Sequence, residues 1–201
     1  MTRGRPCGPA SSILSPAPGS EDMSGLSFNE VMSGSVAGAI TLHAAIAIDD
    51  IDAFLADPNH RGDLTAVIDW LPFGTGMTGT GVFELFKPTA DPKLKLMVYA
   101  CRFEHEGSSY YFDGAKRVRS HSIFHLWSDT TTLYTNIHAG ADAGGKIVGS
   151  GALKLGVPQL AKMMLTFKTY PAGSSGFKTL MAFGGFFLAQ LWDSYVRRPL
   201  S

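Results

Sequence analysis

Residues 93–138 read KLKLMVYACRFEHEGSSYYFDGAKRVRSHSIFHLWSDTTTLYTNIH, a succession of strand-like runs joined by short turns. In the first run, Leu96 and Val98 alternate with Met97 and Tyr99, so apolar side chains lie on both faces of the predicted strand. A half-exposed antiparallel strand is apolar on one face only. Apolar residues on both faces therefore predict a closed barrel, with a hydrophobic lumen inside and a covering helix outside.

Similar runs precede and follow this stretch, and short turns join consecutive runs. Consecutive strands with short connections form an up-and-down meander, and eight of them suffice to close a small barrel. The sequence thus predicts a mainly β protein, an eight-stranded antiparallel up-and-down barrel, with these strands: residues 36–48, 64–71, 80–86, 93–104, 109–119, 122–127, 131–138 and 146–155.

Helices are predicted at two places. A short one follows the first predicted strand at residues 51–56, with Asp50 as its N-cap. Two more follow the last strand and are expected to pack on the barrel; one begins at Val157-Pro158 and the other spans residues 176–196.

The last helix is apolar around most of its circumference. Residues 179–192 carry no charge, but these 14 residues are fewer than the roughly 20 that span a bilayer. Gly184-Gly185 in mid-helix suggests that the backbone presses closely on a sheet. Alternatively, residues 177–195 form an interface with a second copy or a partner subunit, or contact a membrane surface.

The composition limits the class of protein. There are 17 basic and 17 acidic residues, so the basic footprint of a nucleic-acid binder is missing. Cys7 lies in a Ser- and Pro-rich segment and Cys101 in a predicted strand, so a disulfide between them is not expected, which favours a reducing, cytoplasmic location. Residues 1–22 are interpreted as a disordered leader, and residues 23–201 as one domain.

The sequence contains partial matches to common cofactor motifs, but they lie in the wrong structural context. Gly74-x-Gly76-x-x-Gly79 has the glycine spacing of a dinucleotide site, but a strand-like run follows it where a helix is required. His121 and His125 have ligand spacing only on a helix, and their surroundings resemble a strand. No G-x-S-x-G elbow occurs. No metal, nucleotide or other cofactor is therefore implied.

Polar residues within apolar strands are the candidates for chemistry. Glu84 and Asp69 are the predicted catalytic carboxylates, although Glu84 could also point outward. Lys116 is the third catalytic candidate, because period-two alternation with Phe112 and Val118 places it inside the barrel. A buried ammonium needs a carboxylate; Asp129 and Glu84 are the candidates, and Asp129 is the expected partner. The predicted ligand-binding residues are Trp70, Tyr99, Phe103, Phe112, Trp127, Asp129 and Tyr134.

Several short motifs resemble the accessory domain fused to sterol oxidases of the glucose–methanol–choline flavin oxidoreductases. They are Leu26-x-Phe28-x-Glu30-x-Met32-x-Gly34, Gly81-x-Phe83-x-Leu85-Phe86, Tyr99-x-x-x-Phe103, Gly114-x-Lys116 and Leu126-Trp127-x-Asp129-Thr130-Thr131-Thr132-Leu133. The resemblance implies a sterol- or lipid-facing module without the flavin domain. More distantly, the meander resembles lipocalin-like (calycin) and allene-oxide-cyclase barrels.

These observations leave three functions open. The first is binding of a hydrophobic small molecule, such as a sterol, terpenoid, polyketide or fatty acid, in the barrel. The second is cofactor-free isomerisation or cyclisation of such a molecule by acid–base catalysis. The third is service as an accessory subunit of a separate oxidoreductase, docked through residues 177–195.

Overall fold

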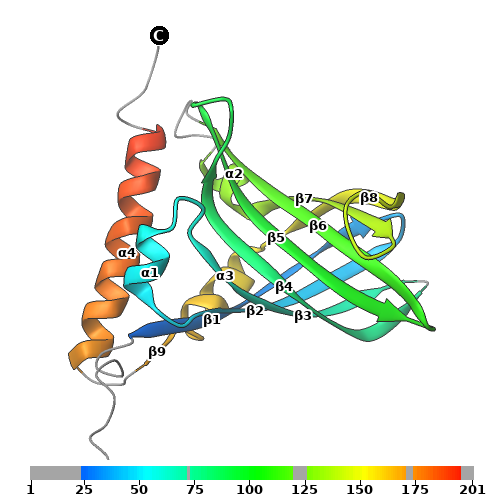
Figure 1. Cartoon of the computed structure of the whole chain (residues 1–201), viewed down its shortest axis with the longest axis horizontal. Coiled ribbons are helices and arrows are strands. Elements are labelled where there is room, and N and C mark those ends of the chain that lie inside the picture. Colours follow the sequence, from blue (N-terminus) through cyan, green and yellow to red (C-terminus); the bar gives the residue numbers. More distant parts are fainter. Residues whose placement is uncertain (1–23, 72, 120–125, 171–173, 196–201) are drawn as a thin grey trace, which may run out of the picture.

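A computed structural model describes residues 24–71, 73–119, 126–170 and 174–195 (Figure 1). Within these residues the chain forms a closed antiparallel β-barrel, one extra strand and four helices. The barrel strands are β1 (Gly25–Val36), β2 (Ala39–Ile48), β3 (Arg61–Trp70), β4 (Gly74–Pro88), β5 (Leu94–His105), β6 (Ser108–Arg119), β7 (Thr132–Ala139) and β8 (Lys146–Lys154).

The predicted fold class is confirmed. Each strand from β1 to β8 pairs with the next along the chain, and β1 also pairs with β8, which closes the sheet. Two errors concern individual strands. The strand before β2 is not predicted separately, and residues 126–127, the end of the strand predicted at residues 122–127, are helical.

The first error concerns residues 36–48, which are not one strand. Ala37 and Gly38 form a tight turn between β1 and β2, and both have positive φ angles, 50° and 143°. The strands on either side pair antiparallel over their whole length, from Leu26 opposite Ile48 to Ser35 opposite Ala39. As a result, the short helix α1 (Ile51–Ala56) follows the second strand, not the first.

The second error concerns the sequence before β7. Residues 126–131, which include the end of the predicted sixth strand, form helix α2 (Leu126–Thr131). The hydroxyls of Thr130 and Thr131 donate hydrogen bonds to carbonyls one turn earlier, those of Leu126 and Trp127, at 2.7 and 2.5 Å. Residues 122–125 lie outside the described residues.

The remaining helices lie at one end of the barrel. Asp50 caps α1 as predicted, and its carboxylate accepts hydrogen bonds from the Asp52 and Ala53 amides. Helix α3 (Val157–Met164) packs on β1, and strand β9 (Lys168–Tyr170) adds to the outer edge of β1. Helix α4 (Ser174–Tyr195) stands across this end, in contact with α1, β1 and β9 (Figure 1).

Two features of α4 bear on its role. A side chain added at Gly184 or Gly185 would meet no atom within 4 Å, so the close approach of backbone to a sheet that was expected at these glycines is not present. No helix among the described residues is long and apolar enough to cross a membrane.

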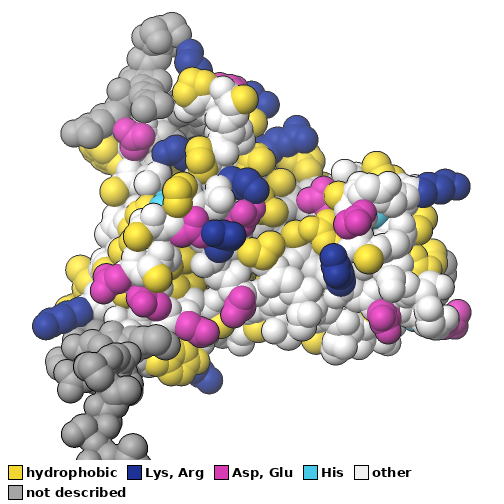
Figure 2. Space-filling view, in the orientation of Figure 1, with side chains coloured by type: hydrophobic (Ala, Val, Ile, Leu, Met, Phe, Trp, Pro, Cys, Tyr) yellow, Lys and Arg dark blue, Asp and Glu magenta, His cyan; other side chains and the backbone are white. Residues whose placement is uncertain are grey.

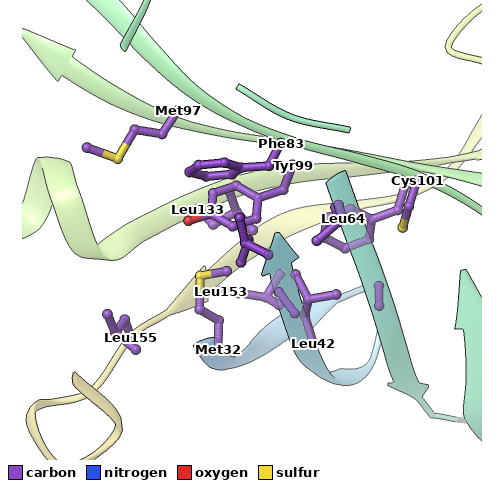
Figure 3. Close-up of a cluster of buried hydrophobic side chains, with 14 of the residues drawn as sticks. Met32, Leu42, Leu64, Phe83, Met97, Tyr99, Cys101, Leu133, Leu153 and Leu155 are labelled. Carbon is purple, nitrogen blue, oxygen red and sulfur yellow. The ribbon is translucent and has the colours of Figure 1, made fainter. Parts of the chain in front are cut away.

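Tightly packed side chains fill the middle and the far end of the barrel. Met32, Leu42, Leu133 and Leu153 come from four strands and meet beneath Tyr99 (Figure 3). Further from the helices, aromatic residues complete the filling; these are Trp70, Phe73, Phe103, Tyr110 and Phe112. The end that the helices cover is packed differently.

At that end the barrel wall has a gap. The pairing of β6 with β7 stops at Ala115, and the pairing of β1 with β8 covers only Ser33–Val36. Because β7 and β8 are shorter than their neighbours, the outer parts of β1 and β6 extend past them. Among the described elements, α2 packs against β6 and α3 against β1, so helices replace the missing wall.

Candidate functional site

A cavity of about 670 Å³ lies between the gapped end of the barrel and helices α2, α3 and α4. Its wall is mostly apolar and comes from strands, helices and the segments that join them. The lining residues are Phe28, Glu30, Phe83, Leu85, Met97, Tyr99, Lys116, Leu126, Trp127, Thr130, Thr131, Leu155, Leu160, Met163, Met164, Phe167, Leu180, Phe183, Gly184, Phe187, Leu188 and Leu191.

Three polar residues from different strands meet at this cavity. Glu30 of β1 accepts hydrogen bonds from the hydroxyl of Tyr99 on β5 and from Nζ of Lys116 on β6, each at 2.5 Å. Their exposed fractions are 2% for Glu30, 2% for Tyr99 and 3% for Lys116. We call these residues the polar trio.

The trio lies where the barrel wall opens. Glu30 is on the part of β1 beyond its pairing with β8, and Lys116 is the first residue of β6 beyond its pairing with β7. Their ion pair therefore joins the two edges of the gap. The arrangement places a buried ion pair in the mostly apolar wall of the cavity.

Burying the polar trio removes its charges from water, which costs free energy that other interactions must offset. A buried ion pair is held only when both charges also have good hydrogen-bond partners. Glu30 has two donors, and the Lys116 ammonium also lies 5.0 Å from the centre of the Tyr99 ring, a favourable cation–π position. Burial, reinforced by the Glu30 charge and hydrogen bond, raises the pKa of Tyr99, so its phenol stays protonated and donates.

Three predicted site residues line the cavity. The structure places Lys116 inside the barrel, as the alternation of β6 indicated, and it also places Tyr99 at the cavity. Trp127 lines the cavity too, although it lies on α2 and not on a strand.

The partner predicted for Lys116 is wrong. Its ammonium pairs with Glu30 and not with Asp129, which lies on α2 and accepts a long hydrogen bond of 3.5 Å from Ser128. The expectation assumed that the segment around residue 127 was a strand next to β6. That segment is helix α2, so Asp129 lies on a helix and not on a strand paired with β6.

The two predicted catalytic carboxylates do not face the cavity. Glu84 alternates with Phe83 and Leu85, which line it, so Glu84 is on the outer face, where Lys87 binds its carboxylate at 2.8 Å. Asp69 is also on the outer face, where it accepts a hydrogen bond from the Gly76 amide. Glu84 and Asp69 are therefore not placed to transfer protons to a ligand in this cavity.

The other predicted ligand-binding residues lie away from the cavity. Tyr134 is half exposed on the outer wall, with the Arg117 guanidinium 4.9 Å from its ring. Trp70, Phe103 and Phe112 point inward as expected but belong to the packed core, and the Trp70 indole donates to the Val36 carbonyl at 2.7 Å.

Sequence reasoning missed Glu30, although a signal for it exists. Leu26, Phe28 and Met32 share the face of β1 on which Glu30 lies, so period-two alternation would have placed this carboxylate inside. The cavity-lining residues of α3 and α4 carry no comparable signal, because an apolar helix face does not show what it packs against.

Neither a metal nor a nucleotide site emerges from the described residues. No group of three or more His, Cys, Asp or Glu side chains converges there; His121 and His125 lie outside these residues. The glycines at 74–79 lie within strand β4, so the loop and helix that hold a pyrophosphate do not occur at this motif.

A second hollow, of about 450 Å³, lies outside the barrel beside α1. It is more open, and charged residues such as Asp50, Asp57 and Arg61 line part of it. Asp50 caps α1 and Asp57 binds Arg61 at 2.7 Å, so these side chains already serve local structure.

Comparison with protein-family models, with curated proteins and with solved structures finds no match to this chain.

Proposed function

We propose that the protein binds a hydrophobic small molecule, such as a sterol, terpenoid, polyketide or fatty acid, in the cavity beside the polar trio. The observation that carries the proposal is a mostly apolar cavity of about 670 Å³ with a buried ion pair in its wall. Small-molecule sites in proteins commonly measure about 300–1,000 Å³ and combine an apolar wall with a few placed polar groups.

The polar trio favours a ligand with an oxygen atom at one end. A lysine ammonium has three N–H donors, and among the described residues Glu30 is its hydrogen-bond acceptor. The remaining donors can reach a ligand carbonyl or hydroxyl. The Glu30–Lys116 pair is neutral overall, so a neutral oxygen fits better than a carboxylate, which would bring an unbalanced charge into an apolar site.

The first experiment is equilibrium binding to ligands that share one carbon skeleton and end in a hydrocarbon, an alcohol, a ketone or a carboxylic acid. The ketone and the alcohol are expected to bind in the micromolar range, at least about tenfold more tightly than the hydrocarbon. If no apolar ligand binds more tightly than about 0.1 mM, the proposal fails.

Two neighbouring glycines provide a matched pair of variants. Gly184 lines the cavity, Gly185 is exposed next to it, and a new side chain has open space at both positions. We predict that Gly184→Phe fills the cavity and weakens ligand binding at least about tenfold, whereas Gly185→Phe leaves affinity unchanged. Equal effects of both substitutions would place the ligand elsewhere.

Acid–base isomerisation or cyclisation in the same cavity is the second candidate function. It is favoured by a specific observation: Glu30 is a carboxylate buried beside the cavity, between a phenol and an ammonium. Glu30 would move a proton, while Lys116 and Tyr99 stabilise the charge that develops on a ligand oxygen.

Solvent exchange separates catalysis from binding. A bound ketone in deuterated water is expected to exchange its α-hydrogens faster with the wild-type protein than with Glu30→Gln, as followed by NMR. Exchange no faster than in buffer, for a ketone that binds, would leave binding as the function.

A further inference from the structure

Exposed apolar side chains from three helices surround the mouth of the cavity. Trp127 of α2, Met164 of α3 and Leu188 of α4 all line the cavity, yet they are 47%, 59% and 66% exposed. Side chains that line one cavity and remain about half exposed lie at its opening. They therefore form a hydrophobic rim.

The rim continues onto the adjoining surface. Leu165, at the end of α3, is 87% exposed, and the outer stripe of α4 adds Phe177, Met181 and Trp192 at helical spacing with Leu188. We call this surface the mouth patch: Trp127, Met164, Leu165, Phe177, Met181, Leu188 and Trp192. Figure 2 shows hydrophobic side chains at the surface over the helical end of the molecule, on the left, with both basic and acidic side chains near them.

Within residues 154–190, which carry most of the mouth patch, all charged side chains are basic. Residues 154–190 contain four lysines, Lys154, Lys162, Lys168 and Lys178, and no aspartate or glutamate. All four lysines are exposed. The nearest carboxylates along the chain are Asp142, between β7 and β8, and Asp193 of α4, which pairs with Lys95 at 3.7 Å.

We propose that the mouth patch docks on the surface of an anionic lipid bilayer. Exposed Leu, Met, Phe and Trp side chains enter the headgroup region, and the lysines bind lipid phosphates and carboxylates. A second copy of the chain fits this surface less well, because it would bring the same four lysines together. The contact goes beyond ligand binding, since it does not depend on what the cavity holds.

Docking in this orientation has a direct consequence for the cavity. Its mouth would face the bilayer, so a hydrophobic ligand could pass between the lipid and the cavity without crossing water. The apolar rim and the apolar cavity would then form one continuous path.

The test is sedimentation of the full chain with vesicles of phosphatidylcholine alone or with about 30% phosphatidylserine. The wild-type protein is expected to bind the anionic vesicles at least about tenfold more tightly. Raising the salt from about 0.1 M to about 0.5 M should weaken this binding, because salt screens the lysines. Equal binding to both vesicles, or no binding to either, would overturn the proposal.

Variants test the two components of the surface separately. Leu165→Glu should weaken binding at least about tenfold, whereas the control Ile147→Glu, half exposed near the opposite end of β8, should not. Replacing both Lys162 and Lys168 with glutamate (Lys162→Glu, Lys168→Glu) should weaken binding to anionic vesicles by about fivefold for each lysine. Lys146→Glu is the control for a change of charge elsewhere on the surface.

Ligand affinity and oligomeric state distinguish the bilayer proposal from its alternatives. Leu165→Glu should retain the ligand affinity of the wild-type protein, so a loss of vesicle binding is distinguishable from a failure of the binding site. If light scattering shows a dimer that Leu165→Glu dissociates, the mouth patch is an interface between two copies and the bilayer proposal is wrong.

Discussion

The Glu30–Lys116 pair is the residue-scale feature on which the site depends. Removing one partner of a buried pair leaves the other charge without compensation, which costs roughly 3–5 kcal/mol. We predict that Lys116→Met and Glu30→Gln each lower the free energy of unfolding by about this amount in urea titrations. A loss below about 1 kcal/mol in Lys116→Met would contradict the buried pairing.

A double variant serves as the control for this prediction. Lys116→Met combined with Glu30→Gln removes both charges, so it should be more stable than the sum of the two separate losses predicts. Strict additivity would mean that the two residues act independently.

Cys101 provides a second prediction at this scale, through pH. Burial raises the pKa of the Cys101 thiol from 9.0 to about 12. The folded protein then keeps this proton between pH 9 and pH 12, while the unfolded chain releases it, so stability is full below pH 9 and falls as the pH rises toward 12. Urea titrations across this range should show a smaller decline for Cys101→Ala, and an identical decline would refute the assignment.

At the scale of elements, helix α4 is weaker than its length suggests. Gly184 and Gly185 each disfavour helix by up to about 1 kcal/mol, and neither allows a close approach to another element. We predict that Gly185→Ala stabilises the protein by about 0.5–1 kcal/mol, measured by thermal or urea unfolding. Gly81→Ala is the contrasting case, because a side chain there would clash with the Ala100 carbonyl oxygen, and it should destabilise.

Elements with local signals could be predicted from the sequence, and those with distant partners could not. The cap of α1 by Asp50 and the strands β5 and β6 follow from neighbouring residues. Strand β1 was missed because the alternation of Val36 and Ile40 continues across the turn at Ala37-Gly38. The apolar residues around Trp127 predict a strand. The segment is instead helix α2, in which the hydroxyls of Thr130 and Thr131 donate hydrogen bonds to helix carbonyls.

The same reasoning explains the incomplete prediction of the site. The inward position of Lys116 depends only on the period of β6, so it could be read from the sequence. Its partner depends on which strand lies across the gap, and Glu30 reaches it only because β7 and β8 end early. The cavity itself depends on how three helices pack, and this packing cannot be predicted from a local sequence pattern.

At the scale of the whole molecule, the closure of the barrel has a kinetic consequence. The pairs from β1–β2 to β7–β8 each join strands that are consecutive in the chain, whereas the β1–β8 seam joins Ser33–Val36 to Gly151–Lys154. Contacts between residues so distant in sequence form slowly, because the entropy of the intervening chain opposes them. The seam is also short, so the partly folded chain is expected to persist as an open sheet whose β1 and β8 edges can pair with other molecules. Refolding at high protein concentration should therefore lose material to aggregation before the barrel closes.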